Sequence, residues 1–395
     1  MTRVTRKIKD VISEVKSGDW GKDSPTENYT TEVLCVRGAD IPELCKGNVG
    51  KIPQRFIHNK KATSKILSAN NLIIEISGGS PTQSTGRIAL ISDKILSRYS
   101  KPLICSNFCK AITATGVQPE YLFNYWLYLY NKDAMFPYEN GTTGIKNLDF
   151  NSFIQEQDIS IPDIKTQQKI VSILSSIDEK IETNKRINDN LEEQAKALFK
   201  SWFVDNQEPT WEKKTLADIV NIWDSMRKPL SATERDKMQK IYPYYGATSL
   251  MDYVDNYLFD GIYLLMGEDG TVVDDKGFPI LQYVYGKFWV NNHAHVLTGA
   301  NGFSTECIYI LLSTTNVKSI VTGAVQPKIN QANLKNIPIV IPPEDVLSDY
   351  KAIIHPLFAK IRNNSMEIHR LTIIHNTLLP KLMSGELSVE EVSFD

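Results

Sequence analysis

The pattern of apolar and polar positions divides the chain into two long helical segments and two globular ones. In each long segment, apolar residues recur at alternating three- and four-residue steps, the spacing of a helix with one buried seam. The first stripe consists of Ile170, Ile173, Ile177, Ile181, Ile187, Leu191 and Leu198. The second consists of Ile353, Leu357, Ile361, Ile368, Leu371, Leu378 and Leu382. We expect the first helix to begin between Ile164 and Gln168 and the second to run from Asp345 to Met383.

The two helical segments are copies of one another. Sliding the chain by about 180 residues places Ile159, Ile161 and Pro162 on Ile339, Ile341 and Pro342. The matches continue along the helices with Ile173 and Ile353, Lys180-Ile181 and Lys360-Ile361, Asn184 and Asn364, Leu191 and Leu371, and Leu198 and Leu378. The chain is therefore a tandem duplication of a globular segment followed by a long helix.

The globular segments combine strand and helix signals. Short runs rich in β-branched residues, such as 72–76 and 88–91, alternate with turn signals, and 119–130 has the spacing of an amphipathic helix. We expect an α+β fold of two similar globular domains separated by two long antiparallel, coiled-coil-like helices. The expected boundaries are 1–160, 161–208, 209–342, 343–385 and a tail at 386–395.

Each helix has an apolar seam that must be buried, and the simplest solution is that the two helices pack on each other. Antiparallel packing of a duplicated unit gives an approximate two-fold axis within one chain. The residues expected to pair the helices are Ile177, Ile181, Asn184, Leu191, Leu357, Ile361, Asn364 and Leu371. Asn184 and Asn364 lie near the helix midpoints, and a polar residue in an apolar seam fixes register. The alternative is that both asparagines are exposed.

Composition changes this picture little. The 395 residues carry a formal net charge of −2, where a protein that holds DNA by its own phosphate contacts would carry a basic excess. The charge is compatible with no nucleic acid, or with nucleic acid held mainly by a partner subunit. No run approaches the roughly 18 apolar residues that span a bilayer, and the five scattered cysteines fit free thiols. We expect a cytoplasmic protein that makes no membrane contact.

Three stretches invite a chemical interpretation. The loop 77–87 is glycine-rich but lacks the Gly-Lys-Ser/Thr ending of a phosphate loop, so it is either a polar hairpin loop or a surface that reads base edges. Glu268 and Asp269 are adjacent and would point to opposite faces of a strand, which favours a structural turn. His293 and His295 have no third ligand in view, which disfavours a metal site.

The residues of both halves resemble the specificity subunit of Type I restriction-modification enzymes over essentially the whole chain. The first half carries Ile161-Pro162, Gln167-Gln168-Lys169-Ile170, Ile177-Asp178, Lys180-Ile181 and Leu198-Phe199-Lys200-Ser201-Trp202-Phe203. The second carries Tyr242-Pro243-Tyr244-Tyr245-Gly246, Glu268-Asp269-Gly270, Asn291-Asn292-His293-Ala294-His295, Pro327-Lys328-Ile329-Asn330-Gln331 and Leu379-Pro380-Lys381-Leu382-Met383-Ser384-Gly385-Glu386-Leu387. Their order, together with the duplication, is specific.

The resemblance implies two target-recognition domains that each read one part of a bipartite site in double-stranded DNA. It implies helices that space those domains and dock two modification subunits, which methylate adenine with S-adenosylmethionine. Added restriction subunits would use ATP and Mg to translocate and cleave DNA. The chain itself has no Asn/Asp-Pro-Pro-aromatic motif and no Walker motif, so we expect a non-catalytic recognition subunit that binds no cofactor or metal of its own.

Side-chain chemistry selects candidate DNA contacts, which can equally be solvated surface residues. In the first domain they are Arg55, Lys60, Lys61, Gln83, Thr85, Arg87 and Lys146. In the second they are Arg227, Lys228, Tyr244, Tyr245, His293 and Lys328. Two other functions remain open: a scaffold of two domains that bind something other than DNA, and an enzyme with a site at Glu268, Asp269 and His293.

Overall fold

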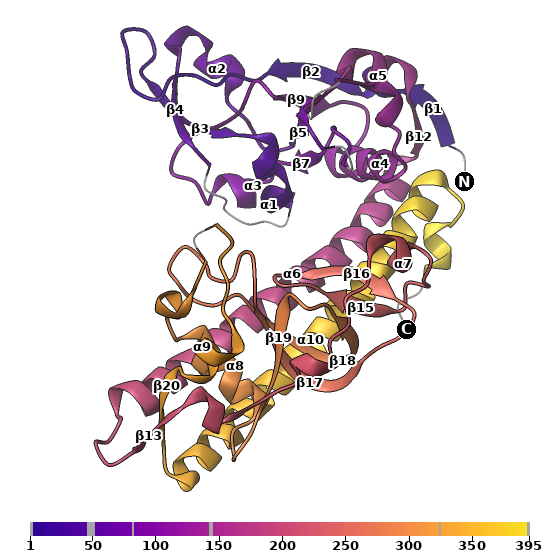
Figure 1. The fold of residues 1–395 in the computed structure, drawn as a ribbon. Helices are drawn as coiled ribbons and strands as arrows, with labels where there is room; N and C mark the ends of the chain where they lie inside the picture. The colour runs from indigo at the N-terminus through magenta and orange to yellow at the C-terminus, as the bar shows by residue number, and fades with distance from the viewer. Residues whose placement is uncertain (1–2, 46–51, 81–82, 142–144, 324, 393–395) are drawn as a thin grey trace. The chain divides into compact units, whose positions relative to one another are not determined.

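The computed structural model describes residues 3–45, 52–80, 83–141, 145–323 and 325–392 (Figure 1). Two compact units make up the chain. Unit 1 comprises Met1–Glu182 and His369–Asp395, and unit 2 comprises Thr183–Ile368. Both long helices, α6 (Ile164–Phe199) and α10 (Glu344–Ser384), are continuous through the boundary between the units. The helix limits expected from the sequence agree with these bounds to within a few residues.

Unit 1 contains twelve strands among the described residues. They are β1 (Arg3–Lys7), β2 (Ile12–Ser17), β3 (Thr31–Val36), β4 (Gln54–Ile57), β5 (Asn71–Glu75), β6 (Ser77–Gly78), β7 (Ile88–Leu90), β8 (Leu103–Cys105), β9 (Cys109–Ala114), β10 (Glu139–Asn140), β11 (Lys146–Leu148) and β12 (Asp158–Pro162). They form four sheets, β1-β12, β10-β11-β6, β2-β9-β5-β7 and β4-β3-β8. Its helices, besides parts of α6 and α10, are α1 (Ile41–Cys45), α2 (Ala62–Lys65), α3 (Asp93–Leu96), α4 (Pro119–Asn131) and α5 (Phe150–Glu156).

Unit 2 has a two-stranded and a six-stranded sheet, in the orders β13-β20 and β14-β19-β17-β18-β15-β16. Its strands are β13 (Glu212–Thr215), β14 (Val220–Ile222), β15 (Tyr242–Tyr245), β16 (Leu250–Val254), β17 (Phe259–Gly267), β18 (Leu281–Val290), β19 (Ala294–Gly299) and β20 (Pro338–Ile341). Its short helices are α7 (Ala232–Asp236), α8 (Thr305–Ser313) and α9 (Gln331–Lys335), and a π-helical segment, η5 (Lys200–Asp205), follows α6. The mixture of sheets and helices confirms the expected α+β class.

The same framework adjoins the long helices in both units. In unit 1 the strand that precedes α6 pairs antiparallel with the first strand of the unit, with Val4 opposite Ile161. In unit 2 the strand that precedes α10 does the same, with Glu212 opposite Ile341. Each unit also sends a central strand into an amphipathic helix, β9 into α4 and β19 into α8. The duplication read from the helices therefore extends into the sheets.

Each unit has its own core, to which the long helices contribute. In unit 1, Trp126 of α4 packs edge-on against Phe153 of α5, with ring centroids 5.0 Å apart, and Ile170 and Leu382 join the same cluster. In unit 2, Tyr350 of α10 lies 4.8 Å from Phe203, and Ile308 of α8 belongs to that cluster. Burial of these large side chains fixes the long helices to the globular part of each unit.

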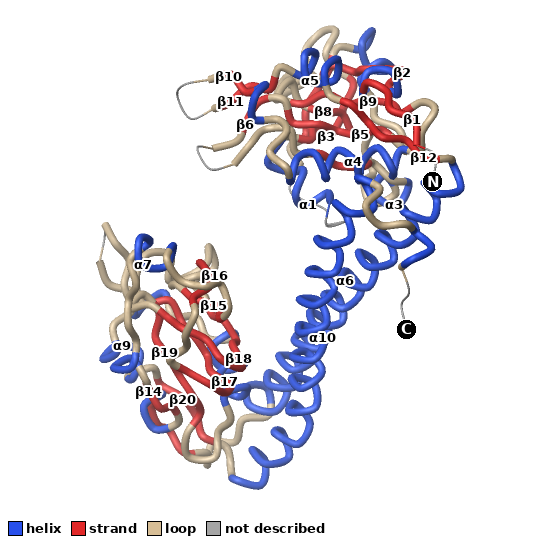
Figure 2. Tube along the Cα trace, turned by 90° about the vertical axis from the view of Figure 1, so that its right-hand side faces the viewer, coloured by secondary structure: helices blue, strands red, loops and turns tan. Residues whose placement is uncertain are grey.

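Within each unit the two long helices run antiparallel and side by side (Figures 1 and 2). In unit 1, His375 lies opposite Asp178, with 3.6 Å between Nε2 and Oδ1. In unit 2, the Tyr350 hydroxyl donates to the Ala195 carbonyl at 3.2 Å, further along α6 but earlier along α10. The residue number of the contact rises along α6, from 178 to 195, while that of its partner falls along α10, from 375 to 350, which confirms the antiparallel arrangement.

The buried seam differs from the apolar stripes in its details. Ile187 and Ile353 are 37% and 40% exposed, whereas Leu174 and Ile354 are fully buried. The first stripe was wrong at Ile187 because the seam passes through the polar residues Asn184 and Asn188 there. The second was wrong at Ile353 because the buried face of α10 in that region carries Tyr350, Ile354 and Phe358, which pack in the core of unit 2. Of the expected pairing residues, Ile177, Asn184 and Asn364 are buried, and the rest are partly buried: Ile181, Leu191, Leu357, Ile361 and Leu371.

Both seam asparagines are 1% exposed, so the alternative that they face solvent is wrong. The Asn184 amide donates to Glu367 Oε2 at 2.8 Å, and the Asn364 amide donates to Asn188 Oδ1 at 2.9 Å. Each asparagine thus bonds across to the opposite helix. Because a buried amide must find a partner, these bonds favour one helix register over its neighbours.

Candidate nucleic-acid interface

In unit 1, an ion pair between Glu75 and Arg87 organises the end of the central sheet. Glu75 closes β5 and is 1% exposed, and Arg87 directly precedes β7. The guanidinium donates Nε–H to Oε2 at 2.8 Å and Nη2–H to Oε1 at 2.6 Å, a bidentate arrangement. The hydrogen bond to Glu75 raises the pKa of Arg87 further above its usual value. The sequence predicts that Arg87 contacts a base, but two of its N–H donors are already bonded to the Glu75 carboxylate.

Two glycines make room for this carboxylate. A Cβ atom at Gly38 would stand 2.4 Å from Glu75 Oε1, and one at Gly78 would stand 2.2 Å from it. Neither position can therefore carry a side chain while Glu75 keeps its place. The glycine-rich start of the loop 77–87 serves the packing of Glu75 rather than a phosphate.

A second polar centre in unit 1 joins the loop 77–87 to β10. The backbone amide of Thr85 donates to Glu139 Oε1 at 2.6 Å, and Lys146 Nζ lies 2.9 Å from Oε2 of the same carboxylate. Thr85, which the sequence predicts as a DNA contact, is fully buried in this structure. Its hydroxyl satisfies Glu139 instead, at 3.1 Å. Pro81 and Thr82 of this loop lie outside the described residues.

The remaining candidates of unit 1 fall into two groups. Arg55 stacks on Trp20, 3.9 Å from the ring centroid, and pairs with Asp23. Lys60, Lys61 and Gln83 are exposed. Exposed ammonium and amide groups on short loops can reach a phosphate or a base edge without rearrangement, whereas Arg55 would have to leave its ring.

In unit 2, Glu268 directly follows the central strand β17, as Glu75 ends the central strand β5 in unit 1. Arg227 Nη1 lies 2.6 Å from Glu268 Oε2, and Lys328 Nζ lies 3.2 Å from Oε1. Burial would raise the pKa of the Glu268 carboxyl, but the hydrogen bond from Arg227 and the positive charges around it lower the pKa overall. Arg227 also donates to the Ala294 carbonyl at 2.7 Å, which ties the end of β17 to the start of β19.

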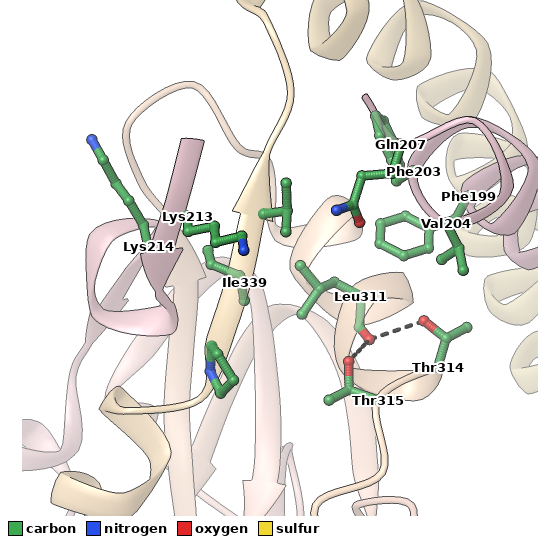
Figure 3. A pocket seen from close by; sticks show the side chains of 12 residues that line it. Phe199, Phe203, Val204, Gln207, Lys213, Lys214, Leu311, Thr314, Thr315 and Ile339 are labelled. Atoms are coloured by element: carbon green, nitrogen blue, oxygen red, sulfur yellow. Dashed lines mark hydrogen bonds between the residues drawn. The ribbon is translucent and has the colours of Figure 1, made fainter. Parts of the chain in front are cut away.

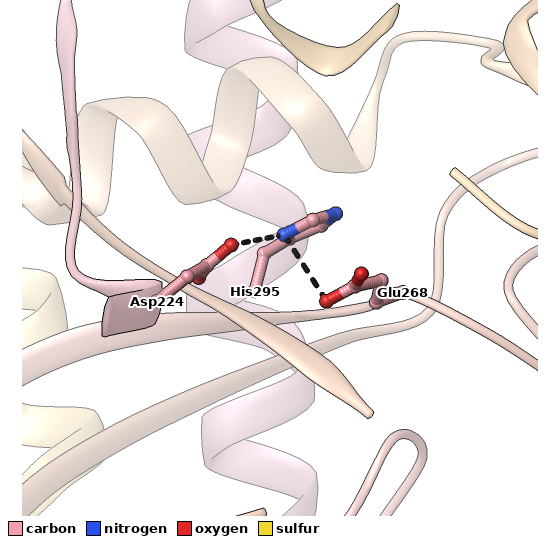
Figure 4. A group of neighbouring side chains, drawn as sticks. All are labelled: Asp224, Glu268 and His295. Carbon is pink, nitrogen blue, oxygen red and sulfur yellow. Dashed lines mark hydrogen bonds and ion pairs between the residues drawn. The ribbon is translucent and has the colours of Figure 1, made fainter. Parts of the chain in front are cut away.

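His295 and Asp224 form a buried hydrogen-bonded pair next to Glu268 (Figure 4). His295 Nδ1 lies 2.6 Å from Asp224 Oδ2, and Nε2 lies 2.8 Å from the Ile329 carbonyl oxygen. The Val296 amide donates to Asp224 Oδ1 at 2.9 Å, and Gln331 Nε2 donates to Oδ2 at 2.6 Å. Burial would raise the pKa of Asp224, but the hydrogen bond and charge of His295 lower the pKa overall.

Asp224, Glu268 and His295 have ligand atoms within 4.8 Å of one another, the one such group of three among the described residues. They do not fit a cation. Both nitrogens of His295 already face oxygen acceptors, so neither lone pair is turned toward a metal. Arg227 and Lys328 already offset the charge of Glu268. The group is a polar support that holds the loops around positions 224, 293 and 329 together.

Sequence reasoning missed Asp224, the third member of this group. It lies 71 positions before His295, and the adjacent pair Glu268-Asp269 drew attention instead. Asp269 points elsewhere and meets His293, with 2.6 Å between Oδ1 and Nδ1. The two carboxylates therefore diverge, as expected for neighbours on an extended chain.

The aromatic candidates of unit 2 belong to the interior. Tyr244, also predicted as a DNA contact, is 1% exposed, and its hydroxyl accepts from the Leu230 amide at 3.0 Å. Tyr245 is half-buried against Phe288, and burial raises its pKa to about 12. Lys228, His293 and Lys328 are exposed and can reach a ligand.

Together, these features define a class: a protein of two α+β domains with exposed cations on their loops, each joined to the same pair of long helices. The model of the Type I restriction modification DNA specificity domain matches residues 4–193 and again 208–371. The chain therefore belongs to the Type I restriction-modification specificity family, and DNA recognition is its role.

Individual relatives agree with this membership. The Type I restriction enzyme MjaIX specificity subunit of Methanocaldococcus jannaschii is 27% identical over 98% of this chain and 94% of its own. The putative specificity subunit S.HindORF215P of Haemophilus influenzae is 33% identical over 41% of this chain and 40% of its own. The crystal structure of a Type I system S subunit from M. genitalium has the same fold, with a TM-score of 0.57 at 18% identity over 97% of this chain and 96% of that one. Among the described residues, no helix is long and apolar enough to cross a membrane.

Proposed function

We propose that each unit reads one half of a bipartite, asymmetric site in double-stranded DNA. The observation that carries this proposal is the contrast between a shared framework and unlike polar centres. The strand pairs next to the helices correspond, with Val4 opposite Ile161 and Glu212 opposite Ile341. The loops hold different groups, a Glu75–Arg87 pair in one and a Glu268–Arg227–Lys328 cluster in the other. Different side chains around the reading loops select different base sequences.

The polar centres position the loops, and exposed side chains make the contacts. Arg87 and Arg227 hold loops in place, because both guanidinium groups are engaged by buried or half-buried carboxylates. The contacts to DNA come from exposed residues of the two units: Lys60, Lys61, Gln83, Lys228, His293 and Lys328. Lys146, Arg55 and Tyr245 can add contacts if they exchange an internal partner for the DNA.

The long helices set the length of DNA between the two half-sites and dock two modification subunits. At 36 and 41 residues, α6 and α10 are long enough to act as a ruler of roughly 54 to 62 Å. The modification subunits supply the methyltransferase activity and many of the phosphate contacts, which fits a net charge of only −2. S-adenosylmethionine, ATP and Mg are used by the modification and restriction subunits, and this chain is not catalytic.

The test is reconstitution with a cognate modification subunit, followed by sequencing of modified bases in treated DNA. We expect methylated adenines in a two-part motif with a fixed spacer and unlike halves. Replacing residues 3–160 with the equivalent segment of a relative should change one half of the motif and leave the other unchanged. A continuous motif, or no methylation by a properly assembled complex, would contradict the proposal.

A further inference from the structure

The end of α6 in unit 2 borders a cavity of about 410 Å³ (Figure 3). Phe203 and Val204 come from η5, Leu311 from α8 and Ile339 from β20. Its full lining is Phe199, Phe203, Val204, Gln207, Lys213, Lys214, Leu311, Thr314, Thr315, Pro338, Ile339 and Val340. The floor of this cavity is apolar, and lysines stand at its edge.

A second cavity, of about 390 Å³, continues the first along α6. The two share Phe199, Val204 and Thr314 as lining residues. The second adds Lys196 and Lys200, so that four lysines line the pair, against one carboxylate, that of Glu193. We call the two cavities together the basic groove. Lys200 and Lys214 have exposed ion pairs within the chain, at 3.6 and 3.1 Å, which a ligand carboxylate can replace at little cost. Lys196 is half-buried and pairs with Glu192 at 2.8 Å.

The part of unit 1 that corresponds to the basic groove is covered by a segment of the chain itself. There, the chain that follows α10 folds back, and Leu387, Val389 and Val392 pack with the core. Val389 is 7% exposed. Beside it, Glu390 pairs with Lys169 of α6, at 3.0 Å between Oε1 and Nζ. A short segment of aliphatic side chains and carboxylates thus covers the framework of unit 1.

In unit 2 the chain that follows α6 buries Trp211 instead, 6.1 Å from Phe203 between ring centroids, and leaves the side of Phe203 toward Val204 and Leu311 open. At the offset of the duplication, Leu387 corresponds to Gln207 and Val389 to Pro209, and both Gln207 and Pro209 are exposed. Counted from the helix starts, Tyr128 of α4 corresponds to Thr314, which directly follows α8 and has a smaller side chain. Val204 remains 56% exposed as a result. The same framework is therefore filled by the chain itself in unit 1 and open in unit 2.

We propose that the basic groove docks a segment of a partner protein that presents two or more aliphatic side chains flanked by carboxylates. The aliphatic groups would cover Val204 and Leu311 as Leu387 and Val389 cover unit 1, and the carboxylates would meet the lysines at the edge. The apolar floor disfavours a DNA backbone as the occupant. This assignment rests on the proposed function in one respect: the partner is taken from the same complex, so the modification subunit is the first to be tested.

A photo-crosslinking amino acid at position 204 tests the occupant. The chain carrying it is assembled with the modification subunit and DNA, irradiated, and the crosslinked peptides are identified by mass spectrometry. We expect a crosslink to one segment of the modification subunit in which aliphatic residues alternate with Asp or Glu. Crosslinks to DNA or to a second copy of this chain would overturn the proposal, and so would the absence of any protein crosslink because the activated group reacts with water.

Substitution tests the energetics. Val204→Asp places a charge on the exposed floor, and we expect it to weaken association with the modification subunit about tenfold or more. Ile241→Asp is the matched control, because Ile241 is 52% exposed and lines neither cavity. Lys213→Glu should also weaken association, and its effect should be larger at low salt than at high salt because salt screens the lost attraction. Thermal unfolding of each variant, measured beside binding, distinguishes loss of docking from loss of fold.

The two proposals fail in different ways. If the wild-type chain supports methylation at a two-part site while Val204→Asp and Lys213→Glu associate as tightly as the control, the groove assignment is wrong and the proposed function stands. If the correctly folded wild-type chain associates with the modification subunit but directs no methylation, the proposed function is wrong. Weakening by Val204→Asp would then still support the groove.

Discussion

The two units are alike next to the long helices and different away from them. Beside α6 and α10, each has a two-stranded antiparallel sheet whose second strand leads into the helix. Farther along, unit 1 places its strands in sheets of three and four, whereas unit 2 gathers six strands into one sheet. The parts that must fit the helices have kept their form, and the parts free to face a ligand have not.

The carboxylates at the ends of β5 and β17 sharpen this contrast. Glu75 meets one guanidinium in a bidentate pair and is almost fully buried. Glu268 meets both Arg227 and Lys328 and is more open, with its side chain 14% exposed. Both halves thus carry an acid at the end of a central strand, but each half balances it with its own cations.

The largest expected effect is the loss of stability when Glu75 or Glu268 is removed, and the two losses should differ. Glu75→Ala leaves the Arg87 guanidinium without its bidentate partner in a largely buried place, and we expect it to destabilise unit 1 by about 3–5 kcal/mol. Glu268→Ala should cost unit 2 less, about 1–3 kcal/mol, because Lys328 can turn to solvent and Arg227 keeps the Ala294 carbonyl. Hydrogen exchange followed through a urea titration reads each unit separately.

Exposed acids serve as controls for this pair of variants. Glu27→Ala in unit 1 and Asp255→Ala in unit 2 should each change stability by no more than about 0.5 kcal/mol. Equal losses for Glu75→Ala and Glu268→Ala would show that the two centres are equivalent, against the comparison drawn here.

Acid should act on unit 2 through Asp224 and Glu268. Both carboxyls have their pKa lowered in the folded state, so the stability that they contribute is fully present above the unfolded-state pKa of about 4. It is lost as the pH falls through the lower folded-state values. We expect unit 2 to lose protection from exchange steeply below pH 4, and Asp224→Asn to make that loss shallower. An unchanged profile in the variant would place the acid sensitivity elsewhere.

Exposed lysines should behave alike in both units, in contrast to the buried acids. Lys60→Ala and Lys228→Ala each remove a flexible cation, and we expect each to weaken binding to all sequences uniformly. The slope of log K against log salt should fall in magnitude by about one for each variant, measured by fluorescence anisotropy with the assembled complex. A change confined to one base position would instead assign base reading to that lysine.

The smallest effect concerns the asparagines of the helix seam. Asn184→Leu removes a hydrogen bond to the charged Glu367, and we expect a cost of about 1 kcal/mol. Asn364→Leu removes a bond to the neutral Asn188 and should cost about half as much. Urea unfolding measures both. A gain in stability accompanied by self-association would show that the asparagines serve register rather than stability.

Sequence patterns predicted the parts of the fold that repeat with a fixed period. The two helices, the duplication and the strands near 72–76 and 88–91 all follow from local spacing, and the structure confirms them. The first stripe failed at Ile187, because a seam that includes Asn184 and Asn188 cannot be traced by apolar residues alone, and the second failed at Ile353, because Ile354 beside it is the residue packed in the core of unit 2. The pairing of β1 with β12 was not predicted, since partners so far apart leave no local signal.

The candidate contacts were harder, for a physical reason. Arg87, Thr85 and Tyr244 have side chains of the kind that bind DNA, yet their hydrogen-bonding groups are engaged within the protein. Asp224 escaped notice because its partners His295 and Gln331 lie far along the chain, in β19 and at the start of α9. Residue type identifies what a side chain can bind, but tertiary contacts decide whether it is available.

The chain order of the two units has a consequence for synthesis. Unit 2 is one continuous stretch, but unit 1 is made of both ends, joined where the Arg3 guanidinium donates to the Leu382 and Met383 carbonyls at 2.7 Å. On the ribosome, residues 3–182 must wait until 369–392 have emerged before their core can close. The unit translated first is therefore the last to be completed, and a premature stop codon in α10 will prevent the N-terminal part of unit 1 from completing its core.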